Sequence, residues 1–323
     1  MDTDFKVLTV DPQNRILTAG EFQSLADVPP EVEWFANIEN SNTRRAYKND
    51  VQEFMKFAGI HQAEEFRLVK RSHLIAWRKQ LESRSLEAST VRRKLSAVAS
   101  LFDHLCECNA VPFNPANGVK RPNNGANEGK SPALGDAQAK ALLEAPPTDT
   151  LKGFRDRAIL SILLFHGLRR AELCSLRVGD IESRRGVMHF RVQGKGGKIR
   201  FLPVHPHSSQ RISEYLERAE HGDDLGKPLF RPVKNSAGNL SSALTGHGVY
   251  KDVVQKYARV LGLDPRSVCV HGLRATAATN ALDHEADIAK VQEWLGHASI
   301  ATTRLYDRRK TKPEDSPTFK VSY

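Results

Sequence analysis

Residues 166–173 read HGLRRAEL, and the architecture of the second half of the chain follows from where this segment lies. It comes directly after the apolar run 155–165, which predicts a buried helix. A Gly-Leu-Arg at the start of a helix is usually structural, so this segment alone assigns no chemistry. It becomes informative together with three further segments, which are GKGGK at 194–198, HGLR at 271–274, and LGH at 295–297 followed by RLY at 304–306.

The GKGGK segment lies between two stretches with strand character. Residues 187–192 alternate between apolar and polar side chains, and 199–204 return as a second strand. This pattern predicts a β-hairpin with Lys195 at its tip, although a glycine-rich turn of this kind is usually only a turn. A helix is expected at 136–144, and the chain is helical again from 249 to 306.

Local signals also position the last segment. Asp287 can cap a helix that runs to residue 295, and Gly296 can end it in a left-handed turn. His297 then projects from a loop, and Ser299 can cap a further helix that carries Tyr306 about two turns later. His271 and Arg274 lie three residues apart, on one helix face, but this spacing often occurs by chance.

The first half of the chain predicts a small helical domain. Apolar side chains recur at helical spacing in 43–58, where Thr43 can cap, and in the helix that follows Ser89 and Thr90; a helix also fits 72–81. Two of these helices carry basic triplets, which are Arg44, Arg45, Lys48 and Arg92, Arg93, Lys94. A solvated helix face is the commoner explanation for any one triplet. Two in one domain favour contact with DNA phosphates.

Composition supports a nucleic-acid partner and a two-domain chain. The 323 residues carry a formal net charge of +10, which suits a polyanion. No apolar run approaches the roughly 20 residues that cross a bilayer, so we expect a cytoplasmic protein without membrane contact. Prolines and glycines mark a linker. The expected segments are a leader (1–30), a helical domain (31–113), the linker (114–133), a catalytic domain (134–310) and a tail (311–323).

Four cysteines are too few and too scattered for a disulfide framework. Cys106 and Cys108 form a lone C-x-C without a partner pair, so no metal site is expected. All four are interpreted as small buried residues. His205 and His207 are expected to cap the exit of the hairpin, with metal binding as the less common alternative.

In order and spacing, the four segments resemble the catalytic domain of the tyrosine recombinases, the phage integrase and Xer-like family, from about residue 155 to 309. Tyr306 follows His297 by nine residues, as in the family pattern. Ala275 departs from it, since many members have a second histidine there. The helical domain resembles the family's core-binding module more loosely, through Asn42, Thr43, Tyr47, Asp50, Phe54 and Phe57.

The resemblance implies a mainly α fold with a small β-sheet. It implies a C-shaped clamp of two domains, a SAM-like core-binding domain and a mixed α/β catalytic domain. It also implies a role for each matching residue. Tyr306 would attack a phosphodiester, Arg169 and Arg274 would bind the phosphate oxygens, and Lys195 would protonate the leaving 5′-oxygen. His271 would assist proton transfer from the tyrosine, and His297 would hydrogen-bond the phosphate.

Physical chemistry is consistent with these residue types. Displacement at a phosphodiester builds negative charge on oxygens that fixed cationic donors stabilise, and arginine stays charged with a planar fork. A tyrosine hydroxyl needs cations or a base to become nucleophilic. A covalent bond between the tyrosine and the phosphate would conserve the energy of the broken phosphodiester, so rejoining would need no ATP. The chain shows neither a P-loop nor a carboxylate cluster for two magnesium ions, so a mechanism without metal, ATP or other cofactor is expected.

The predicted activity is site-specific recombination through a 3′-phosphotyrosine and a Holliday junction, on a mobile element or in cointegrate or dimer resolution. The expected partner is double-stranded DNA with short inverted repeats, bound by a nucleoid-associated homotetramer with a possible accessory protein. Arg308 and Arg309, behind the tyrosine, are further expected DNA contacts. Two alternatives stay open: a type IB topoisomerase-like nicking and closing enzyme, and a catalytically silent DNA-binding protein of the same fold.

Overall fold

The computed structural model describes residues 17–26, 28–123, 133–194, 197–233, 241–265 and 267–307. The chain forms two compact units, Met1–Ala126 and Asn127–Tyr323, and each is described by itself. Three residues with expected roles, Lys195, Arg308 and Arg309, lie outside the described residues, as does the tail. In the described part of the chain, no helix combines the length and apolar character needed to cross a membrane.

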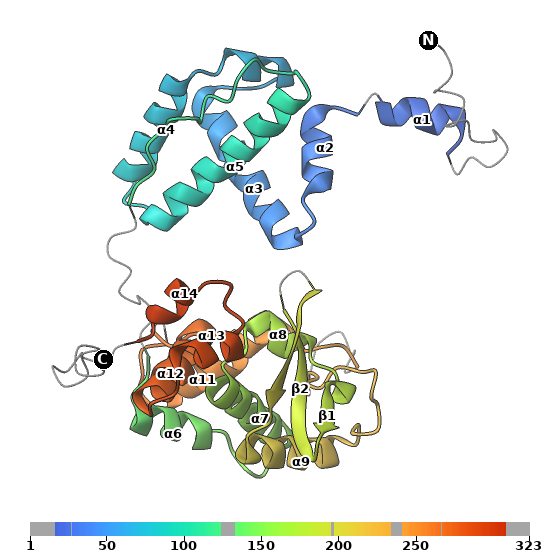
Figure 1. Ribbon diagram of the computed structural model, residues 1–323, viewed down its shortest axis with the longest axis vertical. Helices are drawn as coiled ribbons and strands as arrows, with labels where there is room; N and C mark the ends of the chain where they lie inside the picture. The colour runs from blue at the N-terminus through green and yellow to red at the C-terminus, as the bar shows by residue number, and fades with distance from the viewer. Residues whose placement is uncertain are drawn as a thin grey trace, which may run out of the picture. The chain divides into compact units, whose positions relative to one another are not determined.

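The N-terminal unit is built from helices around α5 (Figure 1). Its elements are α1 (Ala19–Ala26), α2 (Pro30–Asn37), α3 (Ser41–Ala58), the short 3₁₀ helix η3 (Ala63–Leu68), α4 (Arg71–Ser83) and α5 (Ala88–Glu107). Helices α2, α3 and α4 all pack on α5. Their apolar faces enclose a core that includes Phe54, Trp77 and Phe102, each fully buried. The basic triplets therefore lie on a well-packed scaffold.

The start of α3 differs from the sequence prediction. Asn40, not Thr43, caps the helix, because its side chain accepts hydrogen bonds from the backbone N–H groups of Asn42 and Thr43. Helix α1 lies within the predicted leader, where the Thr18 hydroxyl and Glu21 hydrogen-bond each other across its first turn.

Two expectations for α5 are wrong. Lys94 does not lie on an exposed basic face: it is 7% exposed, and its ammonium donates to Asp50 Oδ1 (3.0 Å) and Glu53 Oε2 (2.6 Å) on α3. A buried lysine needs such partners, and α3 supplies them. None of the four cysteines is fully buried either: Cys108 is exposed just beyond the end of α5, and the other three are half-buried.

The C-terminal unit surrounds one buried helix, α7 (Leu151–His166), with Ala158 to Leu163 almost wholly shielded from solvent. Helices α6 (Asp136–Glu144), α9 (Pro206–Ala219) and α12 (Val270–Asp283) pack against α7. The short α8 (Arg170–Ser175) and the 3₁₀ turn η4 (Val178–Asp180) follow α7 and lead into the sheet. The C-terminal end of α7 therefore leads directly through α8 and η4 to the sheet.

The sheet has three antiparallel strands in the order β1-β2-β3. These are β1 (Ile181–Arg184), β2 (Val187–Gln193) and β3 (Ile199–Pro203), with Phe190 of β2 opposite both Ile181 and Leu202. The hairpin of β2 and β3 was predicted, but β1 and α9 were not. Strand β1 is joined to β2 by Arg185 and Gly186, both with positive φ, a two-residue turn whose arginine gives no typical turn signal.

From Gly246 to Arg304 the described residues are mainly helical, as the sequence predicts for 249–306. This stretch contains α10 (Gly246–Gly248), the π-helix η6 (Val249–Val254), α11 (Gln255–Val260), α12, α13 (Ile288–Leu295) and α14 (Ile300–Arg304). The predicted caps are confirmed: Asp287 caps α13 and Ser299 caps α14. Helix α14 ends before Tyr306, so the tyrosine lies just beyond the helix rather than within it.

Candidate active site

Two helices of the C-terminal unit end at glycines in the left-handed conformation. Gly167 (φ 56°) ends α7, and Gly296 (φ 66°) ends α13. A Cβ atom on Gly167 would approach the Leu295 side chain to 3.0 Å. Both the positive φ and the close contact therefore favour glycine at this position. The last carbonyl groups of a helix lack partners within it and carry partial negative charge. These two helix ends therefore offer acceptors to cationic side chains.

Arg274 of α12 uses these acceptors. Its side chain is almost wholly buried, and its guanidinium donates to the carbonyl oxygens of Gly167 (2.5 Å) and Leu295 (2.6 Å). It also donates to Nε2 of His297 at 2.9 Å. Burial, followed by the positive charge of Arg169, lowers the pKa of Arg274 to about 10, so the group still carries its charge at neutral pH. Its direct partners bear no formal charge.

Arg169 caps α8 and is held on two sides. Its guanidinium donates to Glu172 Oε1 (2.7 Å) and to the Gly296 carbonyl (3.1 Å), while its backbone N–H donates to Glu172 Oε2 (2.8 Å). Arg200 of β3 donates to the same carboxylate through both terminal nitrogens, at 3.0 and 2.8 Å. Burial raises the pKa of Glu172, but the hydrogen bonds from Arg200 and Arg169 outweigh it, and the pKa is about 2. An ionised Glu172 thus fixes two arginines.

His297 lies between Arg274 and Thr303. A guanidinium can only donate, so Nε2 of His297 accepts from Arg274, and Nδ1 must carry the proton and donate to Thr303 Oγ1 at 2.9 Å. Burial and the charges of Arg274 and Arg169 lower the pKa of His297 to about 4. The imidazole is therefore neutral near pH 7.

Tyr306 packs in a small core with α12 and α13 and is 6% exposed. Its hydroxyl lies 3.4 Å from Nε2 of His271, and its ring stacks on His297 with a centroid distance of 5.9 Å. Burial raises the pKa of Tyr306, while Arg274 and Arg169 act in the opposite direction. Burial also lowers the pKa of His271. A protonated tyrosine therefore faces a neutral imidazole.

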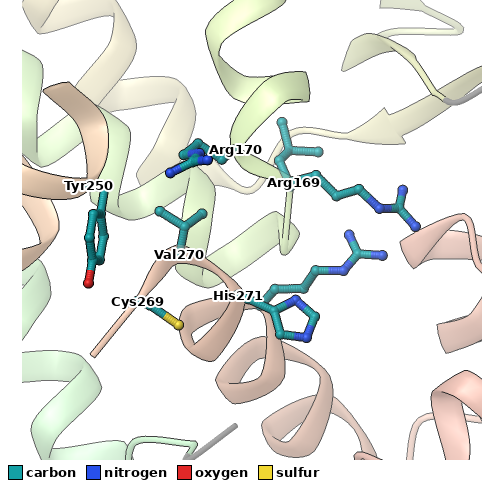
Figure 2. A pocket seen from close by; sticks show the side chains of 8 residues that line it. Arg169, Arg170, Tyr250, Cys269, Val270 and His271 are labelled. Carbon is teal, nitrogen blue, oxygen red and sulfur yellow. The ribbon is translucent and has the colours of Figure 1, made fainter. Parts of the chain in front are cut away.

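A cavity of about 360 Å³ opens beside these groups (Figure 2). Arg169 and His271 lie on one side of it, and Arg170 and Tyr250 lie on the other, with Cys269 at the base of α12 between them. Arg274 also lines this cavity. A space with three arginines and one histidine on its walls suits an anionic ligand.

The structure brings together most residues that the sequence singled out. Five of the six expected catalytic residues meet in one place: Arg169, His271, Arg274, His297 and Tyr306. Sequence reasoning missed Arg200 and Thr303. Strand alternation could have indicated Arg200, because it shares the inward side of β3 with buried Leu202. No local signal marks Thr303, which is fully buried.

Apart from Lys94, the expected DNA contacts of the N-terminal unit are all exposed, but they differ in their hydrogen bonds. Arg45 and Lys48 lie on α3, where the neighbouring Arg44 guanidinium donates to the Ile38 carbonyl. Arg92 donates to the Pro122 carbonyl, and Arg93 pairs with Asp50. Around the tyrosine, the described residues contain no group of potential metal ligands.

Comparison with known proteins identifies the family. The model of the phage integrase family matches residues 133–312, and that of the phage integrase N-terminal SAM-like domain matches 37–107. Tyrosine recombinase XerC of Pelobacter propionicus is 34% identical over 267 residues, which cover 82% of this chain and 84% of the relative. Tyrosine recombinase XerD of Xanthomonas axonopodis is 38% identical over 183 residues, which cover 54% and 57%.

A solved structure shares the fold. The XerH site-specific recombinase, in a post-cleavage complex with its palindromic difH substrate, matches with a TM-score of 0.65 at 23% identity over 81% of this chain and 75% of that one. Both the predicted resemblance and the predicted fold class, mainly α with a small sheet, are confirmed. The chain belongs to the phage integrase family, with tyrosine recombinases of the XerC and XerD type among its relatives.

Proposed function

We propose that this chain cuts and rejoins double-stranded DNA at specific sites, through a covalent bond between Tyr306 and a DNA phosphate. The observation that carries the proposal is the position of the Tyr306 hydroxyl, 3.4 Å from a neutral His271 and beside the charged Arg274. Two solved structures that share the fold, XerH bound to its difH substrate and a lambda integrase dimer bound to a core site, support DNA as the partner.

In this proposal Tyr306 Oη attacks the phosphorus while His271 accepts the hydroxyl proton. A bond forms between phosphorus and the tyrosine oxygen, and the bond to the 5′-oxygen breaks. The products are a 3′-phosphotyrosine and a free 5′-hydroxyl, so religation reverses the step without ATP. Because burial raises the pKa of Tyr306, the hydroxyl needs this base, and a neutral imidazole within reach can serve.

Arg169 and Arg274 would bind the non-bridging oxygens. Their guanidinium groups are fixed before the reaction by Glu172 and by helix-end carbonyls, so no reorganisation is required as charge develops. We assign the protonation of the leaving 5′-oxygen to Lys195, which lies in the sequence between β2 and the strand β3 that carries Arg200. No metal or other cofactor has a role in this scheme.

His297 would donate a hydrogen bond to the phosphate, which requires a proton on Nε2. In the free protein that nitrogen accepts from Arg274. A bound phosphate would draw the donors of Arg274 toward itself and favour the charged imidazole, because a nearby anion raises the pKa of a histidine. His297 would then bind phosphate through Nε2 while Nδ1 keeps its bond to Thr303.

Both the helical domain (31–113) and the catalytic domain (134–310) would bind DNA. The proposed phosphate contacts are Arg44, Arg45, Lys48, Arg92, Arg93, Arg308 and Arg309. We leave Lys94 out, because Asp50 and Glu53 hold its buried ammonium. Each lost phosphate contact should reduce the slope of log affinity against log salt by about 0.9. Arg45→Ala and Lys48→Ala are the cleanest tests, since both side chains are exposed.

We further propose that four copies assemble on two sites with inverted repeats and exchange strands through a Holliday junction, on a mobile element or in dimer resolution. An accessory protein is compatible with this scheme. Mass measurement on one-site and two-site DNA tests the assembly, and a monomer on two-site DNA under active conditions would contradict it.

The decisive experiment captures covalent adducts. The protein is incubated with DNA from its native surroundings, stopped with SDS and digested with protease, and the DNA ends that retain peptide are sequenced. Adducts at one sequence that vanish in Tyr306→Phe would support the proposal. Tyr250→Phe, which changes a tyrosine on the wall of the same cavity, is the matched control and should retain them.

Two other outcomes favour the alternatives. Adducts at every sequence would favour a topoisomerase-like nicking and closing enzyme. A folded protein that binds DNA without forming adducts would favour a catalytically silent DNA-binding protein.

A further inference from the structure

Glu33, His104 and Cys108 form a cluster in the N-terminal unit that the proposed function does not use. Glu33 lies on α2, His104 lies in the last turn of α5, and Cys108 follows the end of α5. The Cys108 sulfur is 3.4 Å from His104 Nε2 and 3.9 Å from Glu33 Oε2, and Nε2 and Oε2 are 3.7 Å apart. Three atoms that commonly bind metals therefore converge from two helices.

These separations are close to those around a tetrahedral zinc ion. With bonds of about 2.3 Å to sulfur, 2.0 Å to nitrogen and 2.1 Å to oxygen, ligand atoms lie roughly 3.3–3.6 Å apart. The cluster has 3.4, 3.7 and 3.9 Å, so shifts of a few tenths of an ångström would complete the geometry. The exposed side chain of Glu33 can make such a shift without disturbing the core.

The surrounding residues favour metal binding in two ways. Glu107 Oε2 lies 4.0 Å from His104 Nδ1, on the side away from the cluster, where a carboxylate favours the tautomer that leaves Nε2 free to bind. Helix α2 is anchored on α5 by the buried Trp34, whose indole donates to Ser100 Oγ at 3.1 Å. The ligands thus come from two helices already held together.

We propose that Glu33, His104 and Cys108 form a binding site for a single zinc ion, with a fourth position open to water. The Cys108 thiol loses its proton to solvent on binding. A mixed sulfur, nitrogen and oxygen set suits zinc better than magnesium or calcium, which prefer oxygen ligands alone. The C-x-C spacing is misleading, because Cys108 pairs with His104 one helical turn earlier and Cys106 takes no part.

Zinc at this position would link α2 to the C-terminal end of α5. It would lie in the N-terminal unit and contact none of the residues assigned to DNA cleavage. The proposal therefore stands or fails independently of the proposed function.

Cobalt titration of the full-length, untagged and reduced protein tests the site, with zinc as competitor. One equivalent of cobalt should produce the thiolate-to-cobalt absorption band, and zinc should abolish it. The band should vanish in Cys108→Ala and persist in the matched control Cys106→Ala. Removal of a ligand in His104→Gln or Glu33→Gln should weaken binding by more than about 10-fold, and Glu107→Gln, which removes only the orienting carboxylate, by roughly 10-fold.

Circular dichroism of each variant establishes that it is folded. If cobalt gives no thiolate band with the folded protein, the close contacts are hydrogen bonds of a free thiol and the proposal is wrong. A band that survives in Cys108→Ala would also overturn it.

Discussion

The two ends of α7 differ in how they hold charge. At the N-terminal end Asp156 is fully buried, and its carboxylate accepts from Arg155 (2.7 and 3.0 Å), from Tyr257 (3.0 Å) and from Lys152. At the C-terminal end Arg274 is equally buried, but backbone carbonyls and a neutral imidazole hold its guanidinium. The cluster around Asp156 pairs an anion with its cations. The cluster around Arg274 holds cations close together with few anions to balance their charge.

This difference separates a structural ion cluster from a site that can bind an anion. A buried carboxylate surrounded by donors has little capacity for a further ligand, and its removal leaves unpaired charges. Guanidinium groups held by carbonyl oxygens keep their net charge, so a phosphate that enters meets uncompensated cations. Variants at the two ends should therefore affect different observables.

Arg274→Lys should give the largest effect. The lysine keeps the charge but cannot reach both helix-end carbonyls and His297, so the rate of adduct formation should fall by about 1,000-fold. Single-turnover cleavage of a nicked or mismatched substrate measures it. Arg155→Lys, at the opposite end of α7, should leave this rate within a few-fold, and an equal loss in both variants would abolish the distinction.

Asp156→Asn should destabilise the C-terminal unit by about 3 kcal/mol, because the charge of Arg155 would stay buried without its carboxylate and the partly exposed Lys152 would lose its ion pair. Urea unfolding followed by circular dichroism measures the loss. The cleavage rate per folded molecule should be unchanged. Lost cleavage with normal stability would show that this end of the helix also serves the reaction.

Arg200→Gln should slow adduct formation roughly 10-fold. Arg200 holds Glu172, which in turn holds Arg169, so its loss should loosen Arg169 without removing any group that contacts DNA. Arg191→Gln, which breaks an ion pair between Arg191 of β2 and Asp180 at the end of η4, is the matched control and should have less than a two-fold effect. Single-turnover rates of both variants, relative to the parent protein, test whether Arg200 positions Arg169.

The smallest effect concerns pH. The pKa of His297 is about 4 in the folded protein and about 6.5 in an unfolded chain. The unfolded state therefore binds more protons between these values, and the free energy of unfolding should decrease as pH falls from 6.5 toward 4. Denaturation midpoints at pH 7 and pH 5 measure it. In His297→Asn this pH-dependent loss of unfolding free energy should be smaller by about 1 kcal/mol. Part of the loss should remain, because the buried His166 also has a pKa of about 4.

Local signals predicted much of the fold and the site. The cap at Asp287, the left-handed end at Gly296 and the cap at Ser299 depend on neighbouring residues alone, and the structure has all three. The grouping of Arg169, His271 and Tyr306 followed from the family resemblance rather than from any periodicity.

What the sequence did not reveal depends on pairings between distant elements. Lys94 occurs among exposed basic residues in the sequence, yet α3 buries it through Asp50. Cys108 has no cysteine partner in the sequence, and its neighbour Glu33 is supplied by α2. Arg200 became notable only when β3 placed it against Glu172.

The position of Tyr306 just beyond the last of the described helices has a consequence for synthesis. Domains generally fold from the N-terminus while the ribosome is still adding residues. The local pair of Arg169 and Glu172 can therefore form early, whereas the acceptors of Arg274 at Leu295 and His297 emerge together with Tyr306, which completes the small core formed with α12 and α13. A nascent chain without these last residues would lack both the fixed Arg274 and the tyrosine, so under the proposed function cleavage would begin only once this C-terminal core has formed.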